Sequence, residues 1–369
     1  MKISYVHGIC VHNDAISNSI RDEVSWLNEA GHDVRLFAYA CDHERVPFTK
    51  VDETSALAFD PHFQSSDLVV YHFGVFYPLF DTIMIAPRSA RRVVVFHNIT
   101  PKEFVPREHH DTIDKSFRQL ANICFADHVI CVSQTNLDVL REAGVRVPAT
   151  VLPLALHSSV TVPPSKPSAQ DGILRLAFLG RFVRSKGPHE LLAALDMVLR
   201  EQPSLQVRLD MIGNLAFSYS TLLVELETMI KAMHARHGGR LLITIHGNAA
   251  EDEKNRLLRE ADLFVLPSYH EGFCVPILEA LASGCQVVSY ANSNIPAITG
   301  GLARLVPSGD ITGLSQAIGE AMHEIAEPSW HAPSGGYTHF AARAGTYVDG
   351  FTPARTRRRF VNFIRHLAS

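Results

Sequence analysis

The segment 266–284 places two glutamates around the expected start of a short helix. Glu271 lies in a loop, Pro276 suits a first helical turn because its missing N–H costs nothing there, and Glu279 follows one turn later. The free N–H groups of a helix N-terminus attract anions. Carboxylates beside such a terminus suit sugar hydroxyls, from which they can accept hydrogen bonds. Stabilisation of the helix dipole, at about 0.3–1 kcal/mol, would account for Glu279 but not for Glu271.

A basic loop supplies the second candidate group. Arg181 and Lys186 stand five residues apart between Gly180 and Gly187, directly after an apolar run typical of a buried strand. In open α/β sheets, ligands bind at the carboxyl ends of the strands. Two cations and free backbone N–H groups could clamp a diphosphate there, although ordinary solvated surface cations would leave the same pattern. The chain has neither the GxxxxGK[ST] nor the GxGxxG pattern, which disfavours a P-loop or an NAD enzyme.

The elements that must position these residues follow a β/α alternation. Short apolar runs alternate with helical patterns, which is typical of parallel sheets with crossover helices. We expect strands at 3–6, 34–39, 68–72, 92–97, 128–132, 174–179, 206–212, 241–246 and 261–267, and helices at 16–30 and 190–200. The Pro- and Ser-rich segment at the middle of the chain predicts a linker.

Two doubly wound α/β domains of similar size result from this alternation. We expect an N-terminal domain at 1–157, a linker at 158–172 and a C-terminal domain at 173–351. The segment 352–369 predicts an amphipathic closing helix that packs back on the N-terminal domain, and a helix lying on a membrane surface is the alternative.

Composition narrows the class of protein. The 369 residues carry a net charge of −4 and are 46% hydrophobic, which suits a globular protein and disfavours disorder and nucleic-acid binding. No apolar run is long enough for a membrane span, and the first eight residues predict a strand, not a signal peptide. Six scattered cysteines suit a reducing compartment, so we expect a cytoplasmic protein. Twenty histidines occur without an HExxH motif, and we expect no metal site.

The glutamate segment resembles the E-x7-E signature of the retaining glycosyltransferase family 4. The 180–187 loop resembles the donor-diphosphate loop of the same family, and the segments 246–248, 261–268 and 287–289 are also similar. The resemblance is dense over 174–307 and looser before it. It implies the GT-B fold, in which two Rossmann-like domains face each other across a cleft.

The resemblance also implies roles for individual residues. Arg181 and Lys186 would bind the donor diphosphate, Glu271 would contact hydroxyls of the donor sugar, and Glu279 would hold the ribose. Cys274 replaces a glycine common in the family, and we expect it to act through its backbone N–H and not through its thiol. The remaining candidates for nucleotide binding are Gly247, Asn248, Gly272, Phe273 and Val275.

In the N-terminal half, His97 and Asn98 follow a predicted strand. His97 matches a histidine frequent in the family's active sites, and a structural histidine is the alternative. The loop 8–18 departs from the family's usual Gly-Gly turn, because Asp14 and Ala15 stand there, so the resemblance supports no acceptor or phosphate contact by this loop. Ser17 or Asn18 could still cap the following helix and line the cleft.

Together these features and the resemblance predict transfer of a hexose from a nucleotide-diphosphate sugar to an acceptor hydroxyl. Retention of configuration is what the resemblance implies. We expect a glycan or a lipid-linked sugar as acceptor, with contact to a membrane surface left open, and no cofactor. The chain has no Asp-x-Asp, so we expect metal-independent catalysis. A GT-B sugar-nucleotide epimerase or hydrolase, or a binding protein without turnover, remains an alternative.

Overall fold

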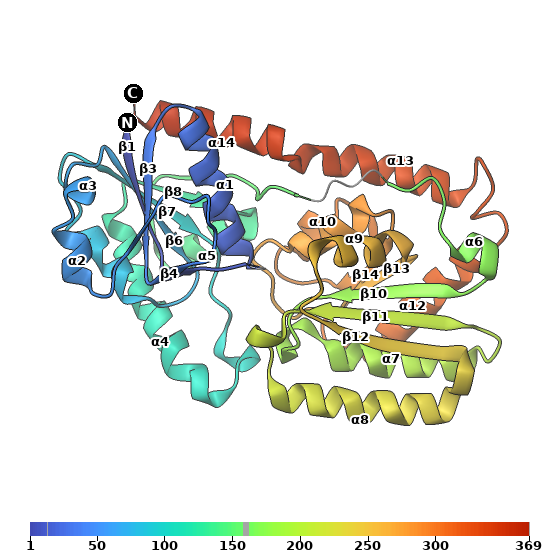
Figure 1. The fold of residues 1–369 in the computed structure, drawn as a ribbon. Helices are drawn as coiled ribbons and strands as arrows, with labels where there is room; N and C mark the ends of the chain where they lie inside the picture. Colours follow the sequence, from blue (N-terminus) through green and yellow to red (C-terminus); the bar gives the residue numbers. More distant parts are fainter. Residues whose placement is uncertain (13, 158–161, 369) are drawn as a thin grey trace. The chain divides into compact units, whose positions relative to one another are not determined.

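The computed structural model describes residues 1–12, 14–157 and 162–368, which form two compact units (Figure 1). The first unit comprises Met1–Ala155 with Phe351–Ser369, and the second comprises Leu156–Gly350. Each unit has its own parallel sheet and its own core. The six cysteines are free, and no helix of the described residues is long and apolar enough to cross a bilayer.

The first unit is built on a seven-stranded sheet with the order β5-β3-β1-β6-β7-β8-β9, in which every pairing is parallel. Its strands are β1 (Lys2–Val6), β3 (Asp33–Ala38), β5 (Phe48–Lys50), β6 (Leu68–Phe73), β7 (Arg91–Phe96), β8 (His128–Cys131) and β9 (Ala149–Val151). Two short strands, β2 (Ile9–Cys10) and β4 (Ala40–Cys41), pair separately. Its α-helices are α1 (Ala15–Glu29), α2 (Thr54–Ala58), α3 (Pro61–Gln64), α4 (His110–Gln119), α5 (Gln134–Glu142) and α14 (Pro353–Ala368).

Local sequence explains the strand and helix that matter most in this unit. Every residue of β6 is buried, as expected of a central parallel strand covered on both faces. Asp14 caps α1, since its carboxylate accepts a hydrogen bond from the backbone N–H of Ser17 at 2.9 Å. Gly31 follows the helix with a φ of +86°, a conformation that glycine adopts without steric cost.

The second unit is built on a six-stranded parallel sheet with the order β12-β11-β10-β13-β14-β15. Its strands are β10 (Leu174–Leu179), β11 (Val207–Gly213), β12 (Leu241–Gly247), β13 (Leu263–Leu266), β14 (Gln286–Tyr290) and β15 (Ala303–Val306). Its α-helices are α6 (Ser168–Asp171), α7 (Pro188–Glu201), α8 (Ser220–His237), α9 (Glu251–Glu260), α10 (Val275–Ala282), α11 (Ile295–Ile298), α12 (Ile311–Ala326) and α13 (Gly336–Val348). Figure 1 shows α7 and α8 on one side of this sheet and α9 and α10 on the other.

The predicted linker differs from what the structure shows. Residues 158–161 lie outside the described residues, and residues 162–172 belong to the second unit. Lys166 is 2% exposed and donates hydrogen bonds to the backbone oxygens of Arg259 at 2.9 Å and Ser283 at 2.7 Å. Ser168 donates to Asp262 at 2.5 Å. Residues 162–172 are therefore held to the second unit by buried hydrogen bonds, which their proline- and serine-rich composition does not indicate.

The closing helix α14 lies on α1 of the first unit, so the chain returns to the domain in which it began. The rings of Trp26 and Phe360 lie 6.1 Å apart, and Arg357 forms an ion pair with Glu29 at 2.5 Å. Phe360, Val361 and Ile364 are buried, while the arginines face outward or sideways along the helix. The apolar face of α14, for which a membrane surface was the alternative, thus packs against the first unit.

Candidate functional site

In the second unit, two loops meet at the carboxyl ends of β10 and β13. Ser185 in the basic loop accepts hydrogen bonds from the backbone N–H of Tyr269 at 2.7 Å and from the hydroxyl of Ser268 at 3.0 Å. Gly187 has a φ of +67°, and a Cβ there would lie 2.1 Å from the backbone oxygen of Pro267. Glycine at this position therefore allows the basic loop to approach the glutamate-bearing loop closely.

Lys186 and Glu271 form an ion pair across this junction, with Nζ and Oε1 at 2.6 Å. Their side chains are 18% and 7% exposed, so the pair is largely shielded from water. Arg181 in the same basic loop is exposed, and its guanidinium contacts no acceptor among the described residues. In the basic loop, Lys186 is thus paired with a carboxylate, whereas the guanidinium of Arg181 is available to bind an anion.

The N-terminus of α10 lies next to this ion pair. Cys274 is its N-cap, with a φ of +78°, and the carbonyl of Phe273 accepts a hydrogen bond from Asn294 at 2.9 Å. Within the described part of the chain, the backbone N–H groups of Cys274 and Val275 have no acceptor. These two groups therefore remain available to an anion, as the sequence predicts.

The thiol of Cys274 is unsuited to nucleophilic chemistry. Burial, followed by the nearby Glu271 carboxylate, raises the pKa of Cys274 well above its ordinary value. The thiol therefore stays protonated, and it is the thiolate that reacts as a nucleophile. A left-handed N-cap explains why the resemblance places glycine here, because a side chain in that conformation is strained.

Glu279 is held by a lysine that the sequence analysis did not single out. Lys254 on α9 contacts Glu279 at 2.6 Å and Glu251 at 2.8 Å. Burial acts to lower the pKa of Lys254, but these two carboxylates outweigh it and the pKa is raised. Lys254 follows an acidic helix start by three residues, a pattern that reads as ordinary helix-surface pairing, so its contact with α10 could not be foreseen.

Gly247 and Asn248 lie at the carboxyl end of β12, on the same edge of the sheet as the basic loop. A Cβ at Gly247 would lie 2.3 Å from Leu215, so glycine permits close packing there. Asn248 has a φ of +54°, donates its backbone N–H to Gly213 at 2.9 Å and accepts from the N–H of Leu215 at 2.9 Å. These hydrogen bonds fix the turn at the end of β12.

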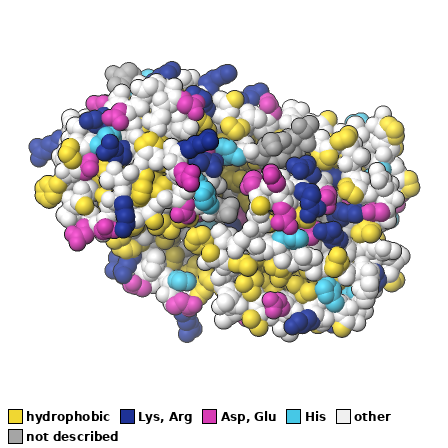
Figure 2. All heavy atoms as spheres, in the orientation of Figure 1, with side chains coloured by type: hydrophobic (Ala, Val, Ile, Leu, Met, Phe, Trp, Pro, Cys, Tyr) yellow, Lys and Arg dark blue, Asp and Glu magenta, His cyan; other side chains and the backbone are white. Residues whose placement is uncertain are grey.

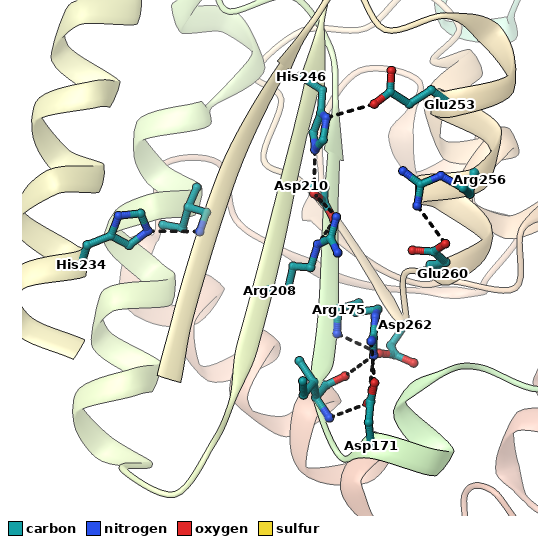
Figure 3. A network of polar contacts seen from close by, with 12 residues as sticks. Asp171, Arg175, Arg208, Asp210, His234, His246, Glu253, Arg256, Glu260 and Asp262 are labelled. Atoms are coloured by element: carbon teal, nitrogen blue, oxygen red, sulfur yellow. Dashed lines mark hydrogen bonds and ion pairs between the residues drawn. The ribbon is translucent and has the colours of Figure 1, made fainter. Parts of the chain in front are cut away.

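A polar network on the neighbouring strands fixes the end of β12 (Figure 3). His246 lies between Asp210 on β11, at 2.7 Å, and Glu253 on α9, at 3.5 Å. Asp210 is 5% exposed and also contacts Arg208 at 2.9 Å. On the face of the molecule in Figure 2, acidic and basic side chains are interspersed over this unit.

In the first unit, His97 directly follows β7. Its Nε2 lies 2.9 Å from Nδ1 of His72, and the two rings stack with centroids 5.1 Å apart. Burial, then the neighbouring rings of His72 and His7, lowers the pKa of His97 well below its ordinary value. His97 is therefore neutral near pH 7. Asn98, with a φ of +74°, accepts a hydrogen bond from the N–H of Ile99 at 2.8 Å.

The predicted site residues thus fall into two groups. The second unit brings together the loop and helix residues that the resemblance implies for the donor, namely Arg181, Lys186, Glu271, Gly272, Phe273, Cys274, Val275 and Glu279, with Gly247 and Asn248 on the same sheet edge. His97 belongs to the first unit. Among residues 1–12, 14–157 and 162–368, no three His, Cys, Asp or Glu side chains gather in a way that could hold a metal ion.

Residues 174–324 match the family model described as Glycosyl transferases group 1. Over these residues the chain is similar to the group 1 glycosyltransferases. A D-inositol 3-phosphate glycosyltransferase of Arthrobacter sp. is 31% identical over 170 residues, which cover 44% of this chain and 37% of that protein. A mannosylfructose-phosphate synthase of Agrobacterium fabrum is 28% identical over 193 residues, covering 50% and 40%. The matches therefore span about two fifths of the length of these group 1 relatives.

Solved structures share the fold over nearly the whole chain. A sucrose-phosphate synthase from Thermosynechococcus elongatus has a TM-score of 0.72 at 18% identity. The match covers 100% of this chain and 99% of the synthase chain. An α,α-trehalose-phosphate synthase (UDP-forming) from Burkholderia xenovorans, in complex with glucose-6-phosphate, has a TM-score of 0.69 at 13% identity, covering 100% of both chains. These likenesses confirm the predicted GT-B fold.

Proposed function

We propose that the chain transfers a sugar from a nucleotide-diphosphate donor to an acceptor hydroxyl, and that the second unit binds the donor. The observation that carries the proposal is the pair of unoccupied N–H groups at Cys274 and Val275 beside the Lys186–Glu271 ion pair. Helix N–H groups and a lysine favour a diphosphate, and a buried carboxylate next to them suits sugar hydroxyls. The family match over 174–324 supports the same assignment.

Without a ligand, Lys186 and Glu271 neutralise each other. A bound diphosphate competes with Glu271 for the lysine, and the carboxylate is then free to accept hydrogen bonds from the donor sugar. The exposed guanidinium of Arg181 supplies a second cation without losing an existing partner. Donor binding thus moves the lysine from the carboxylate to the diphosphate, and hydrogen bonds from the sugar hydroxyls replace the ion pair at Glu271, which limits the cost of desolvation.

The nucleoside end of the donor is assigned to the other end of the same sheet edge. Glu279, held by Lys254, accepts hydrogen bonds from the ribose hydroxyls, and the turn at Gly247 and Asn248 lies near the base. Lys254 balances the negative charge of Glu279 beside the proposed phosphate site. Phe273 and Gly272 shape the loop between the two glutamates.

In the transfer step, the bond between the sugar's anomeric carbon and the diphosphate oxygen breaks, and a bond to the acceptor oxygen forms. Negative charge grows on the leaving diphosphate, and Lys186, Arg181 and the α10 N–H groups stabilise it without a divalent metal. Attack from the same face retains the configuration, with the acceptor proton passing to the leaving phosphate oxygen. His97 is the residue of the first unit that we assign to the sugars being joined.

Names of the relatives guide the choice of acceptor. The names of two matched proteins include a phosphorylated polyol and a phosphorylated sugar. Phosphorylated sugars and polyols are therefore the first class of acceptor to test for transfer of a hexose. Glycans and lipid-linked sugars, offered in vesicles, form the second class, because the sequence predicts a cytoplasmic enzyme of glycan or glycolipid synthesis.

The test is a product analysis by mass spectrometry. The protein is incubated with UDP, GDP, ADP and dTDP sugars, with and without acceptors of both classes, and with and without a chelator of divalent metals. We expect a nucleoside diphosphate and a glycosylated acceptor, formed only when an acceptor is present and at equal rates with the chelator. Donor consumption at the same rate without any acceptor would contradict transfer and indicate an epimerase or hydrolase. Transfer is also measured in Lys186→Ala. The matched control is Arg184→Ala, which removes an exposed cation of the same loop.

A further inference from the structure

Behind His97, a chain of hydrogen bonds runs into the core of the first unit. Nε2 of His97 lies 2.9 Å from Nδ1 of His72, and Nε2 of His72 lies 3.1 Å from Oε2 of Glu23 on α1. His72 is fully buried and Glu23 is 6% exposed. The three side chains come from β7, β6 and α1, so the fold itself aligns them.

Glu23 is closely surrounded. Its carboxyl group also accepts hydrogen bonds from the hydroxyl of Ser19 at 2.8 Å and from that of Tyr5 at 3.1 Å. The other titratable groups facing the chain of hydrogen bonds are His7, Asp14 and Asp22. His7 is fixed by a contact of its Nδ1 with the backbone oxygen of His72 at 3.0 Å.

Neutral imidazole has one N–H, so each ring in the chain must donate with one nitrogen and accept with the other. If Glu23 is ionised, Nε2 of His72 donates to it, Nδ1 of His72 accepts from Nε2 of His97, and Nδ1 of His97 is left as an acceptor. If Oε2 of Glu23 carries a proton, every bond reverses, and Nδ1 of His97 becomes a donor. The geometry allows no third arrangement in which both rings are neutral and both contacts are kept.

We propose that Glu23 and His72 are positioning residues that set which ring nitrogen of His97 carries its proton. The Nδ1 atom of His97 has no partner among the described residues, so it is the nitrogen that a ligand can meet. It presents a donor or an acceptor according to the charge on Glu23. The inference rests on the proposed function for what Nδ1 meets, a sugar oxygen, whereas the hydrogen-bond chain is a property of the protein alone.

Electrostatics place the reversal in an accessible pH range. Burial raises the pKa of Glu23 to about 8, against the opposing hydrogen bonds from Ser19 and Tyr5, and burial lowers the pKa of His72 to about 3. Near pH 7 both rings are therefore neutral, Glu23 is protonated and Nδ1 of His97 donates. A cavity of about 30 Å³ lined by Glu23 and Asp22 is large enough for a water molecule.

Nitrogen-15 NMR of the free protein, labelled at histidine, tests the proposal without any substrate. The signals of His97 are assigned by their loss in His97→Gln, and its tautomer is followed from pH 6 to 10. In Glu23→Gln an amide nitrogen in the place of Oε2 donates to His72 as an acid protonated there does, and with this orientation the variant should keep the Nδ1–H form at every pH. The wild-type protein should change to the Nε2–H form with a midpoint near pH 8. Glu29→Gln, an exposed glutamate of the same helix, is the control.

A difference in the His97 tautomer between the wild-type protein and Glu23→Gln at any pH supports the proposal, and identical tautomers at every pH overturn it. Tyr5→Phe removes one donor to Glu23 and should move the wild-type midpoint to higher pH, which provides a second reading if Glu23→Gln does not fold. With an active donor and acceptor, kcat/KM should change by more than threefold around pH 8 in the wild-type enzyme and not in Glu23→Gln. Absence of transfer would count against the proposed function and leave the NMR result standing.

Discussion

Replacing Lys186 by alanine removes the cation that shields Glu271 and should weaken both the fold and nucleotide binding. Breaking a buried ion pair by removing one partner costs about 3–5 kcal/mol, and exposed pairs are worth about 0–1 kcal/mol. With side chains 18% and 7% exposed, the Lys186–Glu271 pair lies nearer the buried limit, and we expect a loss of about 2–3 kcal/mol in the free energy of unfolding.

A double-mutant cycle measured by urea denaturation isolates this effect. The variant Lys186→Ala/Glu271→Gln should recover more than half of the loss, because it no longer buries an unpaired carboxylate. Arg184→Ala breaks a pair whose side chains are 64% and 46% exposed and should cost less than about 1 kcal/mol. Affinity for a nucleoside diphosphate should fall about 10- to 150-fold in Lys186→Ala, as one charge-assisted hydrogen bond is worth about 1.5–3 kcal/mol. If Lys186→Ala is no less stable than Arg184→Ala, or the double variant recovers nothing, the reasoning is refuted.

Three further outcomes are expected. Gly187→Ala should cost about 1–3 kcal/mol more than Gly144→Ala in thermal unfolding, since both have positive φ but only Gly187 has a backbone oxygen within 2.1 Å of the added Cβ. Glu23 keeps its proton in the folded state up to about pH 8 but loses it near pH 4.5 in the unfolded state. Its contribution to the free energy of unfolding should therefore fall by about 1.4 kcal/mol per pH unit between these two values. Glu23→Gln should abolish this slope. Lys254→Ala should weaken nucleotide binding by releasing Glu279, with calorimetry as the measurement, and unchanged affinity would contradict the role given to the pair.

Much of the fold could be predicted because its signals are local. Apolar runs marked the central strands to within one or two residues, and Pro276 and Gly284 bracketed α10. The resemblance supplied the GT-B arrangement, which periodicity alone could not. The linker was misjudged because burial of Lys166 depends on carbonyls 93 and 117 residues away, and composition carries no trace of such contacts.

Sequence motifs indicate candidate site residues, but they do not indicate the tertiary pairs that those residues form. The E-x7-E spacing and the basic loop drew attention to Glu271 and Lys186, but no sequence pattern indicates that they form an ion pair. Lys254 was missed for the same reason. The contacts of His72 with His97 and with Glu23 join residues 25 and 49 positions apart in the sequence, and each residue alone is typical of a buried strand or helix.

Hydrogen–deuterium exchange tests most directly whether the start of α10 holds a diphosphate. The exchange of the backbone N–H groups of Cys274 and Val275 is followed with a nucleoside diphosphate bound and, as the control, with the corresponding nucleoside. We expect slower exchange at these two positions with the diphosphate only. Binding of the diphosphate with unchanged exchange at both positions would contradict the account.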